Sequence, residues 1–192
     1  MTLYELLLYA HLIGAVVWLG GGVATQFFAL RALASGDSRR IAAFALDIKW
    51  LGDRVLALAS LLTLIAGIAL VWESEAWGFG DDWIVIALVL FAITFVAGVG
   101  FFGPESGRIA ALVSSEGADS PAAQARIRRI LILSRVDLVL LFLIVFDMAV
   151  KPSFDEDAWT IVLALAIAAV LAALLTIGRG DPRREAAGAT AD

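Results

Sequence analysis

Long apolar runs alternate with polar connecting segments along this chain of 192 residues. Each of five runs has about the 20 residues that an α-helix needs to cross a bilayer, and none shows the period of two expected for a strand. Because a helix satisfies its own backbone hydrogen bonds within lipid, the pattern predicts an all-α, polytopic membrane bundle with five transmembrane helices. The runs are residues 4–30, 55–72, 83–102, 130–150 and 159–178.

Most basic residues fall in alternate connecting segments, and this predicts the orientation of the bundle. They lie in the first connector, the third connector and the C-terminal tail, whereas residues 73–82 contain none and residues 151–158 contain only Lys151. Short basic loops stay on the cytoplasmic side of a membrane. We therefore expect the N-terminus outside and the C-terminus inside. The preference for Arg over Lys is typical of a high-GC bacterial genome, so we expect a bacterial inner (plasma) membrane.

Composition excludes several classes of protein. A hydrophobic content of 61% and a mean hydropathy of +0.93 are far from those of a soluble domain. The absence of Cys excludes disulfides and thiolate metal sites, and no basic tract is dense enough for nucleic-acid binding. The expected organisation is a four-helix membrane core (residues 1–152), a peripheral fifth transmembrane helix (residues 153–178) and a disordered cytoplasmic tail (residues 179–192).

Small and polar residues form one stripe on the first apolar run. At helical spacing they share a face about 100° wide, which we expect to look into the bundle because small residues allow close helix packing in lipid. A local distortion is expected at the three consecutive glycines, residues 20–22. We expect the third run to break near Pro104 and residues 114–125 to form a polar loop. The stripe comprises His11, Gly14, Trp18, Gly21, Gly22 and Thr25.

Four ionisable residues lie within the apolar runs, where such groups are costly and face a partner or a cavity. His11 and Asp147 are expected in the outer half of the membrane, where a hydrogen bond forms if their helices are neighbours. His11 is a haem or metal ligand, a proton carrier, or a buried residue that joins two helices. An ion pair or snorkelling to the membrane surface explains the position of Arg135 without a function. Alternatively, Arg135 and Asp137 line an inner vestibule.

The stretch that reads HLIGAVVWLGGG, from His11 to Gly22, resembles the first helix of CopD-like bacterial membrane proteins. Over residues 3–150 the chain is similar to an uncharacterised family of predicted integral membrane proteins. Distantly it resembles the HemJ-type protoporphyrinogen oxidases, in which the matching histidine implies a haem b ligand at His11. Trp18 is a second candidate cofactor-binding residue, or it fills the space left by the neighbouring glycines. The HemJ type pairs that histidine with a lysine early in the third span, and residues 83–90 contain none.

Three functions follow from these residues. The first is a haem- or metal-associated membrane protein that uses His11, shared between two copies of a homodimer because the chain has no second histidine. The second is a small transporter or proton-coupled permeation component, with His11, Asp147, Arg135 and Asp137 along a path. The third is a non-catalytic scaffold or subunit. Whether the protein is an enzyme is left open by the sequence.

Overall fold

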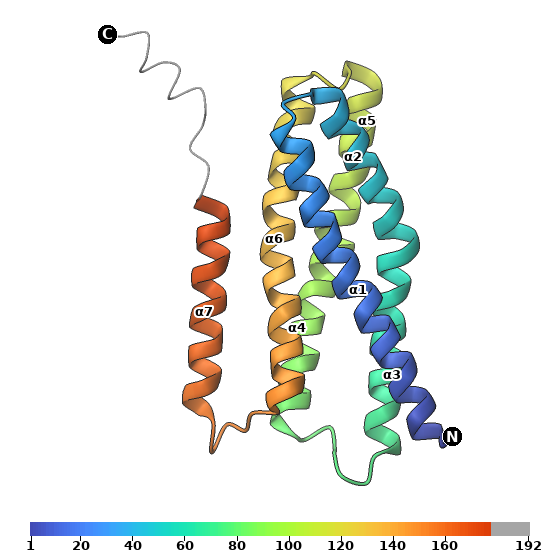
Figure 1. Cartoon of the computed structure of the whole chain (residues 1–192), viewed down its shortest axis with the longest axis vertical. Coiled ribbons are helices and arrows are strands. Elements are labelled where there is room, and N and C mark those ends of the chain that lie inside the picture. Colours follow the sequence, from blue (N-terminus) through green and yellow to red (C-terminus); the bar gives the residue numbers. More distant parts are fainter. Residues whose placement is uncertain (178–192) are drawn as a thin grey trace.

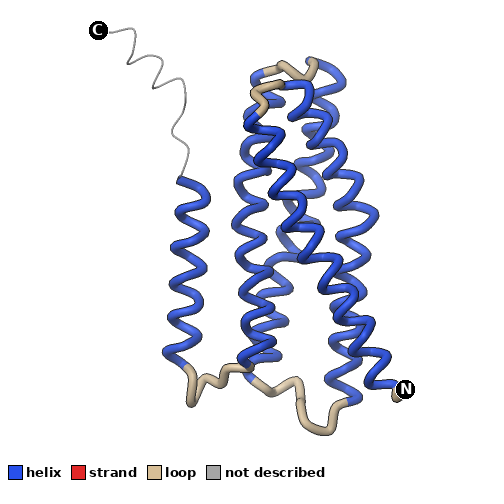
Figure 2. Tube along the Cα trace, in the orientation of Figure 1, coloured by secondary structure: helices blue, strands red, loops and turns tan. Residues whose placement is uncertain are grey.

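All elements of the described chain are helices. The computed structural model describes residues 1–177, within which no strand occurs (Figures 1 and 2), so the all-α prediction is confirmed. The expected disordered tail, residues 179–192, lies outside the described residues. In chain order the elements are α1 (Leu3–Ala34), α2 (Ser38–Leu51), η1 (Gly52–Leu56), α3 (Ala57–Glu73), α4 (Asp82–Ala97), η2 (Gly98–Phe102), α5 (Gly103–Glu116), α6 (Pro121–Val150) and α7 (Ala158–Ile177).

Within residues 1–177, three continuous helices are long and apolar enough to cross a membrane. They are α1, the combined helix Ser38–Glu73 and the combined helix Asp82–Glu116. Each combined helix contains one π-helical turn, η1 or η2, that joins its two α-helical parts without interruption. The first polar connector is therefore helical and extends the second span. The side chain of Asp37 caps it by accepting a hydrogen bond from the backbone N–H of Arg39.

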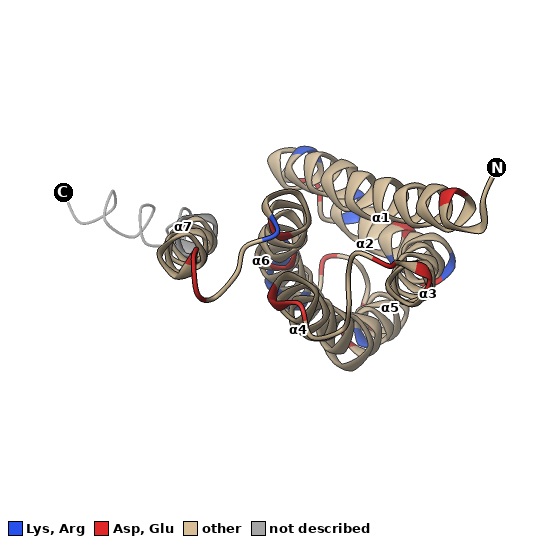
Figure 3. Cartoon of the chain, turned by 90° about the horizontal axis from the view of Figure 1, so that it is seen from below, with Lys and Arg blue, Asp and Glu red and all other residues tan. Residues whose placement is uncertain are grey.

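The helices pack side by side, with α7 at the edge. The main partner of α1 is α3, while α6 packs against α4, α5, α1 and α7. Seen along the bundle, α7 stands outside the group formed by the other helices (Figure 3). The connections between α1 and α2 and between α5 and α6 lie at the end opposite the N-terminus (Figure 1). This end is called the basic end below, because Arg39, Arg126 and Arg128 lie close to those connections.

Several local expectations were wrong. The helix does not break at Pro104, because η2 precedes it and the N–H of Gly103 donates to the carbonyl of Gly98. Pro104 lies in the first turn of α5, directly after η2, and proline is common at this position of a helix. The expected loop at residues 114–125 shrinks to residues 117–120, since α5 continues to Glu116. Residues 20–22 remain α-helical, so the distortion expected there is absent.

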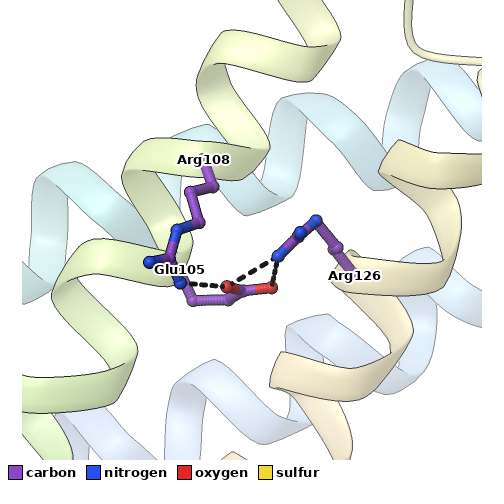
Figure 4. Close-up of polar contacts among 3 residues, drawn as sticks. All are labelled: Glu105, Arg108 and Arg126. Carbon is purple, nitrogen blue, oxygen red and sulfur yellow. Dashed lines mark hydrogen bonds and ion pairs between the residues drawn. The ribbon is translucent and has the colours of Figure 1, made fainter.

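A buried carboxylate ties α5 to α6 at the basic end (Figure 4). Glu105 is 2% exposed, and its two oxygens accept hydrogen bonds from Nη1 of Arg126 at 2.7 and 2.9 Å. Nη1 of Arg108 donates to Oε2 at 3.3 Å from one turn further along α5. Beside this cluster lies an apolar core of Ala29, Ala32, Ile41, Ala42, Ala45, Ile109, Ile127, Ile130 and Leu131. A buried carboxylate and an apolar core therefore lie side by side in this half of the bundle.

Candidate functional site

His11 joins α1 to α3. Its Nδ1 lies 2.8 Å from the backbone carbonyl oxygen of Thr63. A Cβ built on Gly67 of α3 would lie 3.1 Å from two atoms of the imidazole ring, so the ring fills the space above that glycine. One turn along α1, Gly14 is buried against Thr63. The stripe of small and polar residues on α1 does face neighbouring helices, as the sequence predicts.

The expected hydrogen bond between His11 and Asp147 is not formed. Asp147 on α6 is 2% exposed, and neither of its carboxylate oxygens has a hydrogen-bond partner. The N-terminal part of α1 leans towards α3, away from the end of α6 that carries Asp147 (Figure 1). One turn beyond Asp147, the Lys151 ammonium lies 4.0 Å from the ring centroid of Trp77. The two residues therefore belong to different parts of the bundle.

A metal or haem site within one copy does not fit the residues present. Within residues 1–177, no three His, Asp or Glu side chains lie close enough together to hold a metal ion. One imidazole nitrogen of His11 is occupied by the Thr63 carbonyl, and Gly67 closes one side of the ring. The chain has no second histidine to complete a bis-histidine haem site.

A cavity of about 450 Å³ lies between the helices. Its lining includes Lys49, Asp53 and Ser106 as well as Trp18 and Leu141. Residues of α1, α2, α3, α4, α5, α6 and both π-helical turns contribute to its walls. The polar residues of the lining are Thr25, Gln26, Lys49, Asp53, Ser60, Thr94, Ser106, Ser134 and Asp137.

Three residues of this lining carry oxygen atoms without a hydrogen-bond partner. These buried atoms are Oγ1 of Thr25, Oε1 of Gln26 and Oδ1 of Asp137. The amide nitrogen of the same side chain, Nε2 of Gln26, donates a hydrogen bond to Oγ of Ser134 at 2.7 Å. Ser134 in turn donates to the carbonyl of Leu131. A buried polar atom left without a partner costs about 1–3 kcal/mol, so the oxygens of these three lining residues are candidates to bind polar ligand atoms or water.

Both π-helical turns contribute to the cavity wall. Gly52 and Leu56 of η1 and Gly98, Val99 and Phe102 of η2 are lining residues. A π-helical turn inserts an extra residue into a helix and is frequent at functional sites. No pattern in the sequence predicted these turns, although glycines lie in or next to both.

The structure separates the residues that the sequence proposed as one site. Trp18 and Asp137 line the cavity, and the Trp18 ring packs edge-on against Phe91 with centroids 5.3 Å apart. His11, Arg135 and Asp147 are not among the lining residues. The predicted inner vestibule therefore contains Asp137 without Arg135. Gln26 and Ser134 were missed as a pair because their contact joins helices 108 residues apart in the chain.

A second, more open groove lies between α1 and α2. It is lined by Arg31, Arg40 and Asp47 together with apolar side chains that include Phe28 and Trp50. Both aromatic residues are well exposed, so the groove faces the outside of the bundle. None of the predicted site residues contributes to it, and we do not include it in the candidate site.

Comparison with known proteins identifies a family. Residues 5–152 match a family model described as a predicted integral membrane protein (DUF2269). The match ends between α6 and α7. No curated protein matches the chain, and no solved structure matches it.

Proposed function

Because the chain belongs to the DUF2269 family of predicted integral membrane proteins, we propose that its cavity binds a small polar solute or ion within the bilayer, as in a transporter or permeation component. The observation that carries this proposal is the grouping of unpartnered oxygens from Thr25, Gln26 and Asp137 in one cavity lining. Ionisable groups inside membranes commonly mark solute and ion pathways.

The proposal includes five transmembrane helices, with the basic end in the cytoplasm of a bacterial cell and the N-terminus outside. The axes of α6 and α7 lie roughly parallel to those of the three long apolar helices (Figure 1), which supports counting α6 and α7 as spans. The distribution of Arg residues supports the orientation. On this reading residues 1–152 form the core that binds the solute, and α7 is a peripheral helix that packs on α6.

Thiol labelling tests whether water reaches the cavity. Since the chain has no Cys, a single introduced thiol is the only one that can react. We expect Ser60→Cys, on the cavity wall, to be modified by a water-soluble thiol reagent in membrane vesicles. The substitution exchanges one small side chain for another, and Ser60 is 8% exposed. The measurement is the labelled fraction over time, determined by mass spectrometry.

Ala87→Cys is the matched control. Ala87 is 5% exposed, similar to Ser60, and it does not line the cavity. We expect it to react at least about tenfold more slowly, because no water-filled space leads to it. Equal and slow labelling of both thiols, in protein that remains folded, would show that the cavity is closed to water and would refute the proposed function.

Haem association through His11 is the competing function. The Thr63 carbonyl occupies only Nδ1 of the imidazole, so Nε2 is the nitrogen that would face a haem shared between two copies. The absorption spectrum of the purified protein tests this function. A Soret band that disappears in His11→Ala would establish it, whereas a colourless protein in which His11→Ala only lowers stability would assign His11 to helix packing.

A further inference from the structure

We propose that the ligand of the cavity is a small organic ammonium ion, held by Asp137, Gln26 and Thr25. This inference rests on the proposed function, because it assumes that the cavity binds a solute. It adds the chemical class of that solute. Three properties of the lining support it: the kind of hydrogen-bonding atoms left over, the balance of charges, and the combination of size and apolar walls.

The atoms that lack partners are oxygens that accept hydrogen bonds. Oε1 of Gln26 accepts only, Oδ1 of Asp137 accepts when the carboxylate is ionised, and the hydroxyl of Thr25 accepts as well as donates. One of the two N–H groups of the Gln26 side chain already donates to Ser134. A primary ammonium group has three N–H donors and no acceptor, so it matches three such oxygens.

The charges of the lining favour a cation. The lining contains two carboxylates, Asp53 and Asp137, and one ammonium group, Lys49. Lys49 forms an ion pair with Asp53 one turn away on the same continuous helix. Within the lining, Asp137 is therefore the carboxylate without a basic partner. An anion in the cavity would be repelled by this carboxylate. The one cationic side chain of the lining, Lys49, is already paired with Asp53.

Size and wall chemistry favour an organic ion over a metal ion. Divalent cations such as Ca²⁺ take six to eight oxygen ligands, and no cluster of three acidic or histidine side chains occurs in residues 1–177. A space of about 450 Å³ exceeds the need of a bare ion and accommodates an apolar body. Trp18, Phe95 and Phe102 line it, and aromatic faces attract ammonium groups.

Protection of the Ser60→Cys thiol tests the chemical class directly. We expect methylammonium or benzylammonium to slow the labelling of full-length Ser60→Cys protein in vesicles, since either ion would occupy the cavity beside residue 60. Benzyl alcohol, which has the same ring without the charge, and potassium chloride at equal ionic strength should give no protection. Calorimetric titration of the purified wild-type protein with the two ammonium ions provides the affinity.

Substitutions of the proposed residues test whether they bind the ammonium ion that protects the thiol. Asp137→Asn should weaken ammonium binding about tenfold or more, the loss typical of a hydrogen bond to a charged group. Thr25→Val keeps the side-chain shape, disturbs no existing bond of Oγ1, and should weaken binding by a smaller factor. Asp147→Asn makes the same chemical change on the same helix outside the cavity and should bind as the wild type does.

The outcomes separate this inference from the proposed function. If Ser60→Cys is labelled but neither ammonium ion protects it or binds, the cavity is accessible and the ammonium assignment is wrong. Equal protection by benzyl alcohol, or an unchanged affinity in both Asp137→Asn and Thr25→Val, also overturns the assignment. If Ser60→Cys is not labelled and neither ion binds in the titration, the proposed function itself fails.

Discussion

Arg126→Ala is expected to destabilise the protein by about 2 kcal/mol, because it removes the main partner of the buried carboxylate of Glu105. Arg126 supplies two short hydrogen bonds to this carboxylate, whose side chain is 3% exposed. The Arg126 side chain is itself 42% exposed, so the cost comes from the hydrogen bonds lost by a buried carboxylate that keeps only Arg108 as a charged partner. The measurement is the free energy of unfolding of the purified protein in mixed detergent micelles.

Arg108→Ala is the control for this prediction. Arg108 contacts the same carboxylate through one bond of 3.3 Å, and its side chain is 64% exposed, so its loss should cost about 1 kcal/mol or less. Adding Glu105→Gln to Arg126→Ala should recover part of the lost stability, because the buried charge is removed. Equal effects of the two arginine variants would contradict this account of how α5 is held to α6.

The sequence predicted the membrane fold because the dominant signals are local. Apolar run length identified the helices, and the spacing from His11 to Thr25 predicted correctly which face of α1 meets other helices. The boundaries near Pro104 were wrong, since glycine and proline were taken as helix breakers. A π-helical turn accommodates such residues by changing its hydrogen-bond pattern, and that change leaves no periodic signal in the sequence.

The candidate site was only partly predictable, because it depends on which helices are neighbours. Asp137 and Trp18 were recognised as unusual for their positions, and both line the cavity. His11 and Asp147 were placed at similar depth, but depth does not determine the partner of a helix. In the structure His11 contacts α3, whereas the expected neighbour was α6. The contact between Gln26 and Ser134 likewise required the packing of α1 on α6.

Gly14→Ala is expected to destabilise the protein by about 1–3 kcal/mol, the range found for overpacking a tight interior. A Cβ at this position would lie 2.5 Å from Oγ1 of Thr63 and 3.0 Å from both the carbonyl oxygen of Ala59 and the backbone nitrogen of Thr63. Because two of these atoms belong to the backbone of α3, a side-chain rotation alone cannot relieve the clash. The helices must separate, and the hydrogen bond of His11 to Thr63 lengthens with them.

Gly20→Ala on the same helix separates this packing effect from the intrinsic preference of alanine for helices. A Cβ on Gly20 would have no neighbour within 4 Å, so this variant should be as stable as the wild type or up to about 1 kcal/mol more stable. Thermal unfolding of both variants in the same detergent measures the difference. A Gly14→Ala protein as stable as Gly20→Ala would mean that α1 and α3 are not in close contact at Thr63. The position of His11 between them would then have no support.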